Sequence, residues 1–172
     1  MNAAAFLGAS RQCHGHAEVL LDAVDSREWN PELDRALIRS VLYHLDSALV
    51  MYLRALGENY APGVGALIND PRDLNAQLVK AGVSSPEAVE VVRLSSDPNS
   101  WLYACLEACQ DLSSPGFTRA LVETSRGTSK GDIMVYQEHE KRREPPSAEL
   151  LRMWLRALRE LRDRHYALMA EY

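Results

Sequence analysis

The sequence has few of the features by which functional sites are recognised. It contains no glycine-rich phosphate loop, no nucleophile elbow, no zinc-type spacing of cysteine pairs and no dinucleotide-binding fingerprint. Only three cysteines occur among 172 residues, and an odd number in a chain long enough to build its own core argues against a disulfide framework. We therefore assign no catalytic, cofactor-binding or metal-binding residue from motifs, and we expect a reducing cytoplasm as the location.

An excess of positive charge and long apolar runs are also lacking. The formal net charge is -5 at pH 7, whereas a dedicated nucleic-acid binder needs clustered Lys and Arg facing the phosphates. No window approaches the roughly 18 consecutive apolar residues of a membrane-spanning helix, and the N-terminus lacks the basic and hydrophobic regions of a signal peptide. We expect a soluble protein that binds neither nucleic acid nor membranes.

What the sequence does contain is helical periodicity and a repeated start signal for helices. Apolar residues recur at spacings of three and four, and at four places a capping side chain precedes a proline: Asn30-Pro31, Asp70-Pro71, Ser85-Pro86 and Asp97-Pro98. Ser147 is expected to cap the last helix, and Gly57 and Gly82 to lie at helix ends. The predicted helices cover residues 3–25, 31–60, 71–81, 86–95, 98–112 and 147–171.

These elements predict an all-α fold in one domain, residues 1–172. The three long helices and the 98–112 helix form an irregular four-helix bundle, with the two smaller helices packed at one end. Residues 113–146 are rich in Gly, Pro and Ser and are expected to form a long loop before the last helix. Within this loop, residues 117–124 favour a helical turn, 133–136 have strand-like composition, and 138–144 carry mixed charge typical of a solvated surface.

Two segments fit the loose Arg-to-His spacing of the HEPN ribonuclease superfamily: Arg39 to His44 and Arg159 to His165. In that superfamily the arginine binds a phosphate and the histidine moves protons or positions the attacking hydroxyl. On a helix, Arg39 and His44 point about 140° apart, and Arg159 and His165 about 120° apart. We therefore predict that His44 is a hydrogen-bonded histidine in or at the core. His165, in the middle of an apolar stripe, is predicted to be a packing residue.

Other clusters of reactive side chains have simpler interpretations. Cys13-His14-Gly15-His16 suggests zinc ligands, but consecutive helical residues diverge unless the helix breaks at Gly15. Cys105 and Cys109 share one helix face and could meet Cys13 in a bundle core, but small buried thiols explain them more simply. The arginines of the last helix are nearly cancelled by acidic neighbours, so a solvated face is expected; they are Arg152, Arg156, Arg159, Arg162 and Arg164.

Several segments together resemble an uncharacterised family of small gammaproteobacterial proteins of similar length. The resemblance spans nearly the whole chain and is carried by Gln12 with residues 17–23, residues 40–56 around Tyr-His-Leu, the stretch Asp-Pro-Asn-Ser-Trp-Leu at 97–102, and residues 151–172. The chain departs from the family at residues 13–16, where bulkier hydrophobic residues are expected, and at Arg39, where glutamate is expected. The resemblance implies an all-α cytoplasmic protein and carries over no catalytic residue.

The leading hypothesis is therefore a non-enzymatic helical protein that acts through a protein partner or by self-association. Aromatic residues that would anchor an interface if exposed are Trp29, Trp101, Trp154 and Tyr172. One alternative is a HEPN-like ribonuclease or nucleotide-transferring bundle, which requires His44 or His165 in an arginine-lined cleft. The other is small-molecule or metal binding in the bundle core, which requires Cys13, Cys105 and Cys109 to converge.

Overall fold

The computed structural model describes residues 1–25, 30–113 and 145–170, and every regular element in these ranges is a helix. The all-α fold class is therefore confirmed. Three long helices and three shorter ones follow in chain order, with one short 3-10 turn: α1 (Ala3–Asp25), α2 (Pro31–Tyr60), η1 (Gly65–Leu67), α3 (Pro71–Lys80), α4 (Pro86–Ser96), α5 (Trp101–Ser113) and α7 (Ala148–Ala170).

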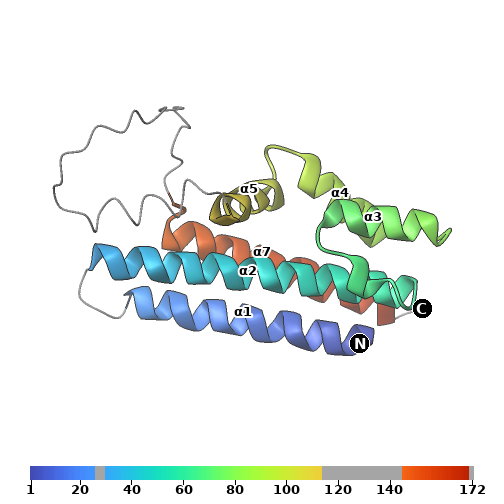
Figure 1. Cartoon of the computed structure of the whole chain (residues 1–172), viewed down its shortest axis with the longest axis horizontal. Helices are drawn as coiled ribbons and strands as arrows, with labels where there is room; N and C mark the ends of the chain where they lie inside the picture. Colours follow the sequence, from blue (N-terminus) through green and yellow to red (C-terminus); the bar gives the residue numbers. More distant parts are fainter. Residues whose placement is uncertain (26–29, 114–144, 171–172) are drawn as a thin grey trace, which may run out of the picture.

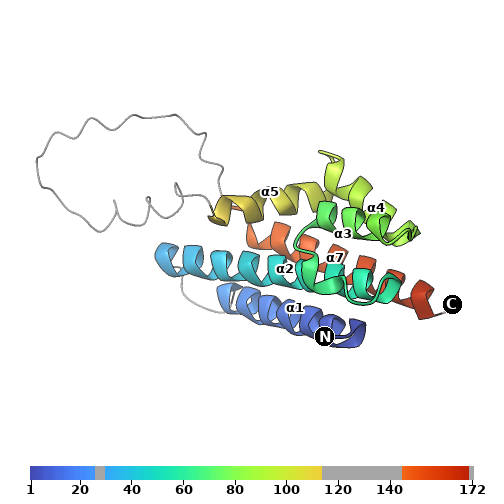
Figure 2. The ribbon, with the colours of Figure 1, turned by 45° about the vertical axis from the view of Figure 1, so that its right-hand side comes forward.

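The helix α2 lies at the centre of the molecule. It forms an antiparallel hairpin with α1 and also contacts α3, α5 and α7. Figures 1 and 2 show α1, α2 and α7 side by side, with α5, α4 and α3 on the other side of α2 and α7. The smaller helices α3 and α4 pack on each other near the C-terminal end of α2, as expected.

The centre of the core is a row of buried side chains on α2. Leu45, Leu49, Tyr52, Leu53 and Leu56 recur every three or four residues and are almost fully inaccessible. Each buried leucine stabilises the fold by roughly 1.5–3 kcal/mol relative to an exposed one. By length and composition α2 is apolar enough to cross a membrane, a property that it shares with the core helices of soluble proteins. Here many of its apolar side chains pack against the other helices, while Leu33 and Tyr43 are exposed.

Three of the four proline-marked helix starts are confirmed. The side chains of Asn30, Asp70 and Ser85 accept hydrogen bonds from backbone N–H groups in the first turns of α2, α3 and α4. Ser147 caps α7 in the same way, accepting from the N–H of Leu150 at 3.2 Å. These side chains satisfy N–H groups that have no partner within the helix.

The fourth predicted start, at Asp97-Pro98, is wrong by three residues. Asp97 accepts the N–H of Asn99 at 3.0 Å and so closes a turn that precedes α5. The cap of α5 is Ser100, whose hydroxyl accepts the N–H of Tyr103 at 3.0 Å. Aspartate followed by proline favours a turn as well as a helix cap, and here the turn is formed.

The predicted helix ends are confirmed at Gly82 but not at Gly57. Gly82 follows α3 with a φ of 70°, and the N–H of Val83 donates to the carbonyl of Leu78 at 3.0 Å, which is the Schellman arrangement. Gly57 lies inside α2, which continues to Tyr60 before Ala61 caps it.

The last helix buries the predicted stripe only in part. Trp154, Leu158, Leu161 and His165 are buried, but Leu168 is exposed. The expectations for residues 117–124, 133–136 and 138–144, for Trp29 and for Tyr172 fall outside the described residues.

Candidate functional site

The arginine and histidine that the sequence paired on the last helix are not brought together. Arg159 is exposed, and its Nη1 lies 3.3 Å from Oε1 of Glu18 on α1. His165 is only 1% exposed and packs in the core. The prediction that His165 is a packing residue is confirmed, and it does not face an arginine-lined cleft.

His165 instead belongs to a buried chain of hydrogen bonds that joins three helices. Its Nδ1 meets the hydroxyl of Tyr52 on α2, and its Nε2 lies 2.9 Å from Oε2 of Glu90 on α4. With a neutral ring, Tyr52 donates to Nδ1 and the Nε2–H donates to the carboxylate, so both ring nitrogens are satisfied. Burial, with the nearby charge of Glu90, raises the pKa of Tyr52 far above its usual value. Tyr52 therefore remains a neutral donor.

Glu90 is the end of this chain that reaches solvent. Nη2 of Arg164 binds its other oxygen, Oε1, at 2.8 Å, so consecutive residues of α7 hold both oxygens. Partial burial favours protonation of Glu90, but the hydrogen bonds from Arg164 and His165 outweigh it and lower the pKa of the carboxyl. Glu90 also lines an open cleft of about 360 Å³ with Arg164, Trp101 and four further residues. The arrangement fastens α4 to α7.

A buried carboxylate lies one turn earlier on α4. Glu87 accepts hydrogen bonds from the hydroxyl of Tyr60 at 2.6 Å and from that of Ser85 at 2.9 Å. Burial raises the pKa of Glu87, but these hydrogen bonds together outweigh burial and lower it. Glu87 and Glu90 thus hold α4 against α2 and α7 as anions.

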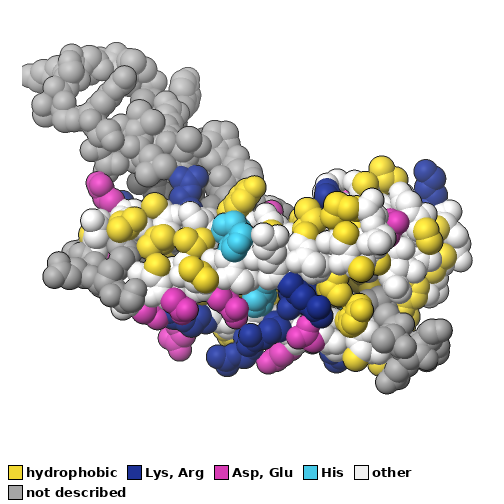
Figure 3. All heavy atoms as spheres, turned by 90° about the horizontal axis from the view of Figure 1, so that it is seen from below, with side chains coloured by type: hydrophobic (Ala, Val, Ile, Leu, Met, Phe, Trp, Pro, Cys, Tyr) yellow, Lys and Arg dark blue, Asp and Glu magenta, His cyan; other side chains and the backbone are white. Residues whose placement is uncertain are grey.

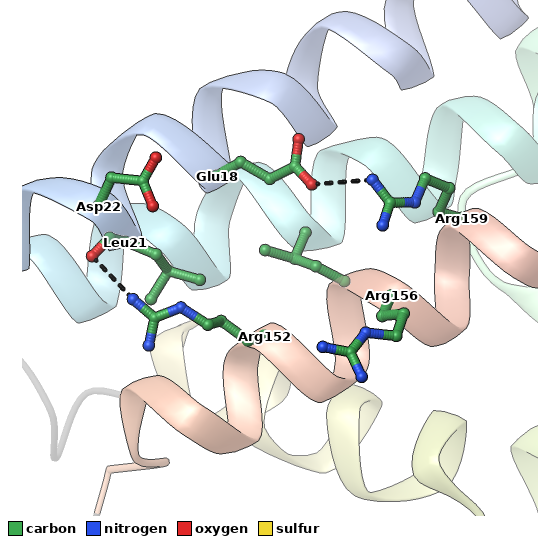
Figure 4. Close-up of a pocket in the computed structure, with 7 residues that line it drawn as sticks. Glu18, Leu21, Asp22, Arg152, Arg156 and Arg159 are labelled. Carbon is green, nitrogen blue, oxygen red and sulfur yellow. Dashed lines mark hydrogen bonds and ion pairs between the residues drawn. The ribbon is translucent and has the colours of Figure 1, made fainter.

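A second charged cleft, of about 290 Å³, lies between α1 and α7. Its walls carry opposite charges, and its floor is formed by two buried leucines; the lining residues are Glu18, Leu21, Asp22, Arg152, Leu155, Arg156 and Arg159. Arg152 donates to the carbonyl of Leu21 at 3.2 Å and also pairs with Asp25. Figure 4 shows Arg152 and Arg159 reaching toward α1, while Arg156 makes no bond across the cleft.

Two further basic side chains on the same two helices are buried: His14 on α1 and Arg162 on α7. They are 3% and 4% exposed, so the expectation that every arginine of the last helix lies on a solvated face is wrong for Arg162. Burial lowers the pKa of both groups. Nη1 of Arg162 and both ring nitrogens of His14 are buried without a hydrogen-bond partner among the described residues, although Nε2 of His14 lies 3.4 Å from Oε1 of Glu18. Both side chains are therefore buried with their polar atoms incompletely paired.

The histidine of the central helix lies at the surface of the core rather than inside it. His44 is half-buried, and its ring contacts the rings of His16 and Tyr43. Its Nδ1 is buried without a hydrogen-bond partner among the described residues, so the expected hydrogen-bonded state is wrong for this atom. Asp46 does not share the open surface of Tyr43, because it is half-buried and burial raises its pKa.

The three cysteines are not placed to bind a metal ion together. The described residues contain no group of three or more His, Cys, Asp or Glu side chains placed to hold one metal ion. The helix α1 continues through Gly15, so Cys13, His14 and His16 diverge. Cys105 and Cys109 are buried free thiols, and the pKa of Cys105 is raised by its hydrogen bond to Cys109 and by burial. They pack as small apolar side chains.

The fold and these sites define a helical protein whose buried polar network joins helices, with one charged cleft at its surface. The model of DUF6586, described as a family of unknown function, matches residues 8–165. The chain belongs to this family, which confirms the resemblance to an uncharacterised family. Comparison with curated proteins gives no match, and comparison with solved structures gives none.

Two members of the buried network, Tyr52 and Glu90, were missed by sequence reasoning. Both are separated from His165 by more than seventy positions in the chain, and neither lies in a motif. The only signal in the sequence was indirect. A histidine inside an apolar stripe requires polar partners from other parts of the chain. The periodicity shows that such partners exist but does not identify them.

Proposed function

We propose that the protein acts by binding another protein, without catalysing a reaction, and that the charged cleft between α1 and α7 is the contact surface. The observation that carries this proposal is the pair Asp22 and Arg156. These residues line the same cleft from opposite helices, and neither has an ion-pair partner among the described residues. Figure 3 shows Lys or Arg and Asp or Glu side chains intermingled along one edge of this face.

The cleft suits a protein segment with charges of both signs. Leu21 and Leu155 form an apolar floor whose side chains are already buried. The charged residues of the walls therefore determine which protein segments bind. An acidic group fits beside Arg156 and a basic group beside Asp22. Complementary charges raise association rates and exclude wrong partners more than they add affinity. A second copy of this chain meets the description, because each copy would offer Asp22 to the partner's Arg156.

The tryptophans support the charged cleft as the contact surface only because neither of the two within the described residues offers a better one. Trp154 was expected to anchor an interface if exposed, but it is 2% exposed and belongs to the core. Trp101 is half-buried at the edge of the other cleft.

The cytoplasm is the proposed location of the protein in the cell, and the three free cysteines agree with it.

Charge reversal at the cleft tests the proposal. The molar mass of the purified protein is measured by light scattering at low and high salt, and partners are captured from cells with the same baits. We expect Arg156→Glu to abolish self-association or partner capture, and Asp22→Arg on the interacting copy to restore self-association. Arg93→Glu on α4, an exposed arginine outside the cleft, is the matched control and should behave as the wild type.

Equal binding by the wild type and by Arg156→Glu contradicts the proposal, as does an equal loss with Arg93→Glu. The ribonuclease alternative is tested with the same proteins. A wild-type RNA-cleaving activity that disappears in a folded Arg159→Ala variant would establish catalysis in place of binding.

A further inference from the structure

Two histidine rings from different helices meet on the face formed by α1 and α2. His16 of α1 is exposed and His44 of α2 is half-buried, and their ring centres lie 5.2 Å apart with an interplanar angle of 77°. Histidine side chains are visible near the middle of the face in Figure 3. His16 has no hydrogen bond or ion pair to any described residue, and the Nδ1 atom of His44 is buried without a partner.

The rings meet edge to face, and their separation falls within the range that shared coordination of a metal ion allows. A zinc ion lies about 2.0–2.1 Å from an imidazole nitrogen, and roughly 1.1–1.2 Å more separates that nitrogen from the ring centre, so a bound metal lies about 3.2 Å from each centre. Two such rings at angles of about 90–109° around the metal have centres about 4.5–5.2 Å apart. The observed 5.2 Å falls at the tetrahedral end of this range.

The environment also keeps His44 in the form that binds metals. Burial first, and the neighbouring His16 second, lower the pKa of His44, and the neutral imidazole is the ligand. An unpartnered buried nitrogen calls for an explanation such as a bound water or ion. Because α1 and α2 hold the two backbones in a fixed antiparallel arrangement, little is lost in ordering the ligands.

We propose that His16 and His44 form a two-histidine site for a divalent transition metal of the Zn²⁺, Co²⁺ and Ni²⁺ class, with water completing the coordination. Imidazole nitrogen suits these ions. Since His16 is exposed, the remaining coordination positions face solvent, as in sites that keep open positions. The site is independent of the charged cleft, so it stands or falls separately from the proposed partner binding.

Titration of the full-length protein with Co²⁺ alone tests the site, followed by its visible absorption and by calorimetry. We expect one ion per chain, with a Co²⁺ affinity that falls about tenfold or more in His16→Ala and in His44→Ala. Alanine at the exposed position 16 leaves the fold intact, which far-UV circular dichroism checks. Tyr43→Phe is the matched control, because it keeps the neighbouring ring and removes no nitrogen ligand.

A replacement ligand sharpens the test. His16→Cys should bind Co²⁺ and add a thiolate-to-metal charge-transfer band that the wild type lacks. The proposal is overturned if the wild type binds no Co²⁺ at millimolar concentration, or if His16→Ala and His44→Ala both bind as the wild type does. Equal weakening by Tyr43→Phe would overturn it as well.

Discussion

Removing the hydroxyl of Tyr52 should destabilise the protein although the side chain keeps its ring. Tyr52 and His165 are both 1% exposed, and the Tyr52 hydroxyl is the partner of Nδ1 of His165. Tyr52→Phe therefore leaves a buried nitrogen without a donor, which costs about 1–3 kcal/mol of unfolding free energy. No cavity larger than one oxygen atom is created. For a domain of this size the melting temperature should fall by roughly 2–12 °C.

The measurement is chemical denaturation with urea, supported by thermal unfolding, on Tyr52→Phe and on Tyr43→Phe. Tyr43 is 65% exposed on the same helix, so its variant should stay within about 0.5 kcal/mol of the wild type. The double variant Tyr52→Phe/His165→Leu should lose less stability than the sum of the two single variants, since it removes both hydrogen-bond partners. Wild-type stability of Tyr52→Phe, or additivity in the double variant, would refute the buried network as a source of stability.

Three further predictions concern other contacts. Because the pKa of Glu90 is lowered in the fold, the stabilisation by Glu90 is present above the unfolded pKa of about 4.3 and is lost as the pH falls through the folded pKa. Urea midpoints measured from pH 6 to pH 3 should therefore fall less steeply in Glu90→Gln than in the wild type. An unchanged slope would contradict this. A Cβ at Gly65 would lie 2.9 Å from the carbonyl oxygen of Arg54, so Gly65→Ala should lower the stability by about 1–3 kcal/mol. Gly15 has open space around it, so Gly15→Ala should raise the stability by about 0.5–1 kcal/mol through helix propensity. Thermal melts of the two variants test this, and equal effects would rule out the steric argument. Arg162→Met should leave stability unchanged or raise it, because an apolar side chain avoids the desolvation of a buried, incompletely paired guanidinium; a loss of more than about 2 kcal/mol in urea denaturation would show that this arginine has a stabilising role.

The sequence by itself determined the helices. Their periodicity and capping residues are local, because each cap bonds to N–H groups two or three residues away. The starts of α2, α3 and α4 therefore agree with prediction. The prediction for Asp97 was wrong because an aspartate before a proline also favours a turn, and because Ser100, three residues later, caps the helix instead. The burial of His165 also followed from the pattern of its own helix.

Only the tertiary structure decided which side chains meet across helices. Glu90 reaches His165, His16 reaches His44, and Glu18 reaches Arg159 through the packing of helices distant in the sequence. A helical pattern fixes which face of a helix is buried, but it leaves open which helix covers that face and at what height. The candidate sites of this protein consist of such contacts, and for that physical reason they could not be predicted from the sequence.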